Sequence, residues 1–155
     1  MKLKILWPGR TRNRDIKNLQ DDYIKKIGHL NRCELIETKE ARGMDERNEN
    51  KIMDREAQGL EKHFNNDYII CLSDKGKEMS SKEFARFLEK LASQSSRAAT
   101  FVVGGFLGLD KRIIQKADFL FSLSKMTFSH ELIRLILLEQ IYRSLTIMKG
   151  QRYAK

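Results

Sequence analysis

Three glycines interrupt and follow the apolar run in TFVVGGFLGLD, residues 100–110, and give the first sign of a binding site. Glycine at such a point permits a close approach of ligand or backbone, or a positive φ. The order Gly104-Gly105-Phe106-Leu107-Gly108 matches neither the G-x-G-x-x-G dinucleotide fingerprint nor the G-x-x-x-x-G-K-[ST] phosphate loop. The dinucleotide fingerprint also belongs to the first strand–helix turn, whereas this loop follows the fourth expected strand. We therefore do not expect an enzyme that depends on NAD or ATP.

Two further loops with small or polar residues follow expected strands. CLSDKG, residues 71–76, ends the third strand, and SLSKMTFSH, residues 122–130, ends the fifth. Ligands of open α/β sheets bind outside the carboxyl ends of the strands. The three loops can therefore enclose one small amphipathic molecule through backbone contacts, or they can be tight turns packed under helices.

The elements that carry these loops alternate along the chain. Apolar runs predict strands over residues 3–7, 33–38, 67–72, 99–103 and 118–124. Apolar residues at helical spacing predict helices over residues 15–30, 52–64, 80–91, 110–117 and 129–148. The alternation implies an α/β fold with a mostly parallel five-stranded sheet and helices on both faces. The length fits one domain over residues 1–155.

The last expected helix is apolar almost all the way round between residues 132 and 145. A helix on the surface of a globular protein shows a single apolar stripe, so this one is expected to be buried on two sides. In a domain of this size, the second side is expected to meet another subunit. The pattern therefore predicts a homodimer.

Charge and composition limit the kinds of partner, the location and the metal sites that we expect. Thirty Lys and Arg against twenty-one Asp and Glu give a net charge of +9, which favours a nucleic-acid partner but also fits a merely basic surface. No segment has the roughly 20 apolar residues of a membrane span, and the start of the chain lacks a signal-peptide pattern, so we expect a cytoplasmic protein. Cys33 and Cys71 predict two buried reduced thiols, and the scattered histidines predict no metal site.

Three segments carry a resemblance to a known family: FVVGGFLGL, FSLSKMTFSHELIRLILLEQIYRS and the terminal RYAK. Together with the first helix and the spacing to DYIICLSDKGKEMSS, they resemble the RlmH family of SPOUT-class methyltransferases over essentially the whole chain. The resemblance implies methylation of 23S ribosomal RNA at N3 of a pseudouridine, within the ribosome, with S-adenosylmethionine as methyl donor. It also implies a deep C-terminal trefoil knot and a homodimer that holds the cofactor at the subunit interface.

The resemblance further implies which residues surround the cofactor. They lie at the ends of the third, fourth and fifth strands, where backbone groups can read an adenine edge. The implied cofactor-binding residues are Leu72, Gly104, Gly105, Leu123, Ser124, Lys125, Met126, Thr127 and Phe128. For the two leucines, ordinary core packing is an alternative or an additional role.

Methyl transfer to an imide nitrogen requires loss of its proton and stabilisation of the resulting charge. Arg134 lies four residues after His130, on the same helix face and beside the cofactor loop, and Tyr153 lies near the chain end where it is free to reach over the site. We predict catalytic roles for Arg134, Tyr153 and His130. A helix-start residue bonded to backbone remains an alternative for His130.

The chain departs from the family pattern at two positions. Ser129 stands where the family usually has proline, and serine is a good helix N-cap. Ala154 stands where the family usually has histidine, which leaves the role of the tail open. Two alternatives therefore remain: a knotted methyltransferase for another RNA nucleotide, and an RNA-binding protein without catalysis.

Overall fold

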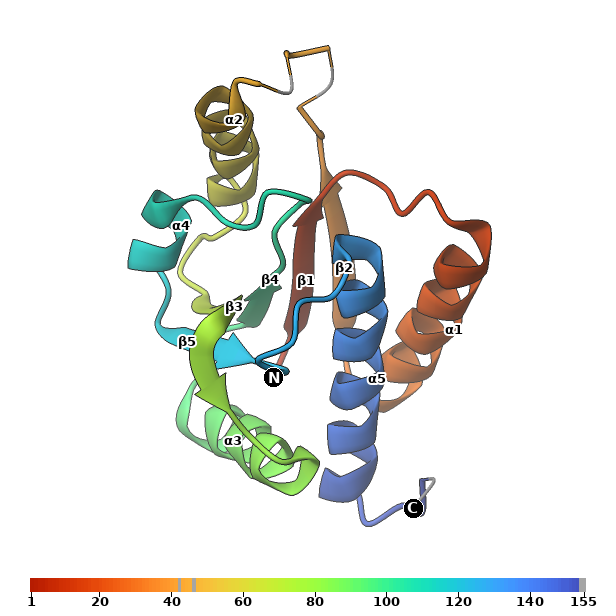
Figure 1. Cartoon of the computed structure of the whole chain (residues 1–155). Coiled ribbons are helices and arrows are strands. Elements are labelled where there is room, and N and C mark those ends of the chain that lie inside the picture. The colour runs from red at the N-terminus through yellow and green to blue at the C-terminus, as the bar shows by residue number, and fades with distance from the viewer. Residues whose placement is uncertain (42, 46, 154–155) are drawn as a thin grey trace.

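The computed structural model describes residues 1–41, 43–45 and 47–153 (Figure 1). Strands and helices alternate as the sequence predicts. In chain order the elements are β1 (Leu3–Pro8), α1 (Arg14–Leu30), β2 (Cys33–Thr38), α2 (Glu49–Glu61), β3 (Tyr68–Glu78), α3 (Ser81–Gln94), β4 (Ala99–Val102), α4 (Lys111–Gln115), β5 (Phe119–Ser122) and α5 (His130–Met148).

The described strands form one sheet in the order β2-β1-β4-β3-β5, and every neighbouring pair is parallel. The predicted α/β fold with a parallel five-stranded sheet is confirmed. Because the strands are parallel, their carboxyl ends share one edge of the sheet. The loops after β3, β4 and β5 therefore lie beside one another, as the binding-site argument requires.

The helices cover both faces of this sheet. Successive strand residues point to opposite faces, so Ile5 packs into one apolar core and Leu6 into the other. The core of Ile5 includes residues of α1, α3 and α5, whereas the core of Leu6 includes residues of α2 and α4. Figure 1 shows α5 running beside α1, with α2 and α4 on the far side of the sheet. This arrangement confirms the predicted two-sided cover.

The third strand extends further than the sequence predicts. The apolar run predicts an end at Leu72, but β3 continues to Glu78. Phe121 of β5 pairs with both Leu72 and Lys77, so residues 73–76 form an excursion from the regular ladder. A Cβ at Gly76 would lie 2.6 Å from the backbone carbonyl carbon of Phe121, so only glycine fits this crossing. The polar residues 73–76, which look like a loop in the sequence, therefore belong to an irregular strand.

The flanks of α5 also differ from the expectation. The apolar pattern predicts another subunit against the second buried side of α5, but α5 packs against both α1 and α3 within the chain. These two neighbours and the sheet account for most of its apolar residues. Leu132 and Ile147 remain 38% and 42% exposed on its outer side. Only this outer side is free for a partner, which weakens the premise of the dimer prediction.

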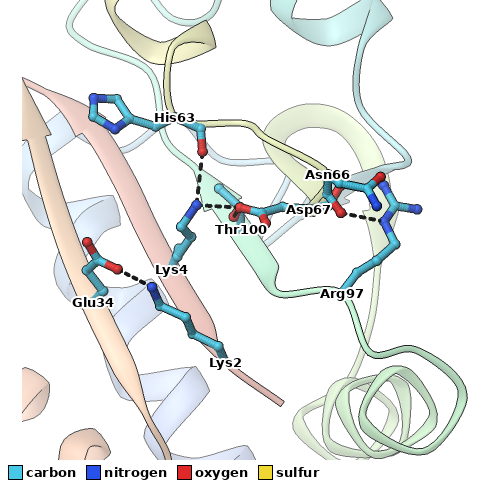
Figure 2. Close-up of polar contacts among 8 residues, drawn as sticks. All are labelled: Lys2, Lys4, Glu34, His63, Asn66, Asp67, Arg97 and Thr100. Atoms are coloured by element: carbon cyan, nitrogen blue, oxygen red, sulfur yellow. Dashed lines mark hydrogen bonds and ion pairs between the residues drawn. The ribbon is translucent and has the colours of Figure 1, made fainter.

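A buried polar cluster joins the sheet to the α2–β3 connection at the edge opposite the loops (Figure 2). Lys4 Nζ lies 2.6 Å from Asp67 Oδ2 and donates to the His63 carbonyl at 3.0 Å. Thr100 Oγ1 donates to the same carboxylate oxygen at 2.7 Å. Buried charges are tolerated when they are paired and hydrogen-bonded in this way. The cluster is therefore structural rather than part of the candidate site.

Candidate active site

A cavity of about 460 Å³ opens at the carboxyl ends of β3, β4 and β5. Its walls come from the three loops that the sequence analysis singled out and from the start of α5. The predicted cofactor residues that line it are Leu72, Gly104, Gly105, Leu123, Ser124, Met126, Thr127 and Phe128. Lys125 does not line it; its ammonium points to Glu78, with 4.0 Å between Nζ and Oε2. One cavity thus brings together nearly the whole predicted set.

The glycine loop after β4 is tightly folded on itself. The Gly108 N–H donates to the Gly105 carbonyl at 3.0 Å, and Gly108 has a φ of +82°. A Cβ at Gly104 would lie 2.5 Å from the Gly108 carbonyl carbon, and one at Gly105 would lie 2.8 Å from Glu56 Oε2. A side chain at Gly104 would clash with backbone atoms, so packing within the protein requires glycine there. At Gly105 the nearest atoms belong to the end of the Glu56 side chain, so the constraint is weaker.

Glu56 of α2 lies beside this loop, a neighbour that the sequence pattern does not predict. Its side chain is buried, with 4% exposure, and burial together with nearby Glu40 raises the pKa of its carboxyl. In the sequence Glu56 looks like an ordinary polar residue on an amphipathic helix. Only the packing of α2 against the loop after β4 brings the carboxylate beside Gly105.

Serine side chains hold the loop between β5 and α5. Ser122 Oγ donates to the Ser124 carbonyl at 3.0 Å, and Ser124 Oγ accepts from the Met126 N–H at 3.0 Å. Ser129 Oγ accepts from the Leu132 N–H at 3.3 Å, so the predicted N-cap of α5 is confirmed. These bonds fix the loop at the wall of the cavity while the Met126 side chain remains 73% exposed.

His130 lies in the wall of the cavity at the first turn of α5. Burial lowers the pKa of its imidazole below the usual 6.5, and the charge of Arg134 lowers it further. Neutral imidazole is the dominant form at pH 7 under these conditions. An unprotonated imidazole can accept a proton from a bound molecule, and the catalytic role of His130 stays a prediction.

Arg134 lies behind His130 rather than in the wall of this cavity. It is 1% exposed, and its Nη2 and Nη1 donate to the carbonyls of Pro8 at 2.6 Å and Gly9 at 3.2 Å. Its guanidinium carbon lies 5.0 Å from the centre of the Trp7 ring, and burial lowers its pKa to about 10. The residue stays cationic and ties α5 to the β1–α1 connection. This placement favours a positioning role over direct contact with a substrate.

Tyr153 lies at the opposite end of α5. Its hydroxyl is 3.1 Å from that of Tyr23, and its ring packs edge-on against Tyr142 at 4.8 Å. Burial and the bond to Tyr23 raise the pKa of its phenol. The 19-residue helix α5 is about 28 Å long, so Tyr153 cannot reach the cavity of its own chain in this arrangement. Residues 154 and 155 lie outside the described part of the chain.

Other kinds of site lack a basis in the described residues. Among residues 1–41, 43–45 and 47–153, no group of three or more His, Cys, Asp or Glu side chains is arranged to hold a metal ion. Within the same ranges, no helix combines the length and apolar character that a bilayer span requires. Cys33 and Cys71 are free thiols, as predicted, although Cys33 is only partly buried.

The fold and the cavity define a class of protein. The family model for "Predicted SPOUT methyltransferase" matches residues 1–154, and the chain belongs to this family. A Streptococcus uberis protein named ribosomal RNA large subunit methyltransferase H is 36% identical over the full length of both chains. A protein of the same name from Acetivibrio thermocellus is 37% identical and covers 99% of each chain. The family resemblance of the sequence is thereby confirmed.

Solved structures agree with the fold. The tRNA (m1G37) methyltransferase of Aquifex aeolicus superimposes with a TM-score of 0.53 over 92% of this chain and 70% of its own, at 13% identity. At this identity the likeness concerns the fold alone. The trefoil knot itself stays a prediction from the family resemblance.

Proposed function

We infer that the protein transfers a methyl group from S-adenosylmethionine to ribosomal RNA of the large subunit. The observation that supports this inference is the cavity at the carboxyl ends of β3, β4 and β5. Nearly all the residues expected to hold the cofactor line it, in a chain of the SPOUT methyltransferase family. The names of the full-length relatives supply the class of RNA.

The cavity suits S-adenosylmethionine in size and lining. Its volume of about 460 Å³ lies in the range of small-molecule sites, and apolar side chains such as Leu72, Leu123 and Ile133 alternate with backbone and hydroxyl groups. The exposed residue Asp74 also lines the cavity, and its carboxylate is the kind of group that binds the amino group of the methionine part. When bound, S-adenosylmethionine supplies a methyl group activated by the positive sulphur. The loops contribute by holding that group in line with the acceptor.

The acceptor we propose is N3 of a pseudouridine, in accordance with the family resemblance. An imide nitrogen must lose its proton before or during methyl transfer, and neutral His130 in the cavity wall can take it. Arg134 holds the first turn of α5 through its bonds to the β1–α1 connection, and thereby positions His130. The net charge of +9 favours approach of an RNA-rich particle.

We also propose a homodimer in which Tyr153 acts on the cavity of the partner subunit. Tyr153 and His130 lie at opposite ends of α5, so a catalytic role for both requires a second copy. The exposed Leu132 and Ile147 on the outer side of α5 supply an apolar contact surface. Sedimentation should give a dimer at micromolar concentration, and L132E should shift it towards monomer. A monomeric wild-type protein would contradict this proposal.

A methylation assay tests the main inference. Purified large ribosomal subunits that lack the modification are incubated with the protein and labelled S-adenosylmethionine, and the modified nucleotide is mapped by mass spectrometry. We expect one methyl group per subunit, on a pseudouridine of the large-subunit RNA. Transfer to another nucleotide would establish a differently targeted enzyme, and cofactor binding without transfer would establish a non-catalytic protein. We propose that the protein acts in the cytoplasm.

A further inference from the structure

A second cavity of about 490 Å³ adjoins the cofactor cavity and was not foreseen from the sequence. It lies between the β1–α1 connection, the segment after β2 and the start of α5. The residues that line it include Arg12, Glu40, Met44, Phe106, His130 and Glu131. Phe106 and His130 line both cavities, so these two side chains form the boundary between them.

We propose that this second cavity binds the nucleobase that receives the methyl group. The proposal rests on the function inferred above and adds the position of the acceptor. A base seated here would present its ring atoms to the cofactor cavity across the boundary of Phe106 and His130. Only these two side chains would then lie between the methyl donor and its acceptor.

The lining suits a flat imide base. The Phe106 side chain is 54% exposed, and an exposed aromatic ring offers a base a face for stacking. Ring carbonyls accept hydrogen bonds, and the Arg12 guanidinium at the mouth is a donor, held by Glu40 at 2.9 Å between Nη2 and Oε2. The buried Ile52 supplies an apolar floor.

Glu131 organises the same wall. Its carboxylate accepts from the backbone N–H groups of Arg12 and Asn13, the latter at 3.1 Å. The two bonds join the start of α5 to the segment that carries Arg12. The β1–α1 connection and the start of α5 therefore form one wall, which carries both Arg12 and His130.

Another cavity, of about 570 Å³, adjoins the cofactor cavity on the opposite side of the glycine loop. Its lining includes Lys75, Lys111 and Gln115, but it contains neither a histidine nor an aromatic side chain. A base placed there would lack both a stacking face and a neutral imidazole. The cavity that contains Phe106 and His130 is therefore the better acceptor site.

The chemistry balances in this arrangement. The imide proton passes to an unprotonated ring nitrogen of His130. The electron pair left on N3 forms the new bond to the methyl carbon, and the pair of the breaking carbon–sulphur bond stays on sulphur. His130 then releases the proton to water. No oxidant, reductant or metal ion is required.

Filling each cavity in turn tests the proposal. Met44 is half-buried and lines the cavity of about 490 Å³, which we call the acceptor cavity. Gln115 is exposed and lines the cavity of about 570 Å³. We expect M44W to lower kcat/KM for large ribosomal subunits at least tenfold while the Kd for S-adenosylmethionine stays within twofold of wild type. Q115W, the matched control, should keep both values. The thermal midpoint of each variant establishes that it is folded.

Three outcomes would overturn the proposal: equal activity of M44W and wild type, loss confined to Q115W, or an equal loss of cofactor affinity in M44W. Absence of cofactor binding and methylation in the wild-type protein would instead refute the function on which the proposal rests. A second pair of variants covers the case in which M44W does not fold. R12A should raise KM for the subunit several-fold, whereas R10A, at an exposed position outside the cavity, should not; equal values would count against the acceptor site.

Discussion

Replacing Gly104 with alanine tests whether the glycine loop shapes the cofactor cavity. The added Cβ would lie 2.5 Å from the Gly108 carbonyl carbon and 2.7 Å from its oxygen. Both are backbone atoms, so the loop must move by about 1 Å to restore an ordinary contact distance. Overpacking of this kind costs about 1–3 kcal/mol, which is roughly 3–9 °C in Tm for a chain of this length.

The same shift displaces Gly104, Gly105 and Gly108, which all line the cavity. We therefore expect G104A to lower the affinity for S-adenosylmethionine at least tenfold by calorimetry, together with the fall in Tm. Gly28 provides the control, because it lies in α1 and a Cβ there would meet nothing within 4 Å. G28A should leave cofactor affinity unchanged and raise stability by about 0.4–1 kcal/mol. Wild-type Tm and affinity in G104A would refute the reasoning.

The remaining predictions concern His130 as the proton acceptor, Tyr153, and the buried ion pair of Lys4 and Asp67. Because burial and Arg134 lower the pKa of His130, methylation should persist below pH 6.5 and fall only as pH drops through that lowered pKa; H130Q should abolish this inflection in a pH–rate profile. Y153F should keep cofactor affinity but lower the methylation rate in the ribosome assay; an unchanged rate would show that the phenol has no part in catalysis. K4M leaves the Asp67 carboxylate buried without its cation and should cost about 3–5 kcal/mol in chemical unfolding. K2M breaks only an exposed pair and should cost less than about 1 kcal/mol; equal costs would contradict the structural role of the buried cluster.

The sheet and the meeting of three loops at its carboxyl edge were predictable because their signals are local in the sequence. Apolar runs locate the strands, and loops at the carboxyl ends of parallel strands must meet at one edge. The extension of β3 was missed, because a polar excursion with Gly76 looks like a loop until β5 is seen to pair on both sides of it. The helix spacing of Arg134 and His130 was correct, but their different surroundings depend on how α5 meets the β1–α1 connection.

The proposed acceptor cavity and the position of Glu56 beside Gly105 depend wholly on tertiary packing. Arg12, Phe106 and Glu131 come from three distant segments, and none of them forms a recognisable motif with the others. Tyr153 shows the converse limit. Sequence can place Tyr153 near the end of the chain, but only the length of α5 reveals that this residue lies far from the cavity of its own chain.

The position of β1 in the sheet has a consequence for synthesis of the protein. β1 pairs with β2, which follows soon after it, but its other partner is β4, where Leu3 lies opposite Ala99. At a translation rate of about 5–20 residues per second, the ribosome needs roughly 5–20 s to make the intervening chain. During that time one edge of an apolar strand remains open to pairing with other chains. The nascent protein is therefore at risk of aggregation until β4 has emerged and can pair with β1.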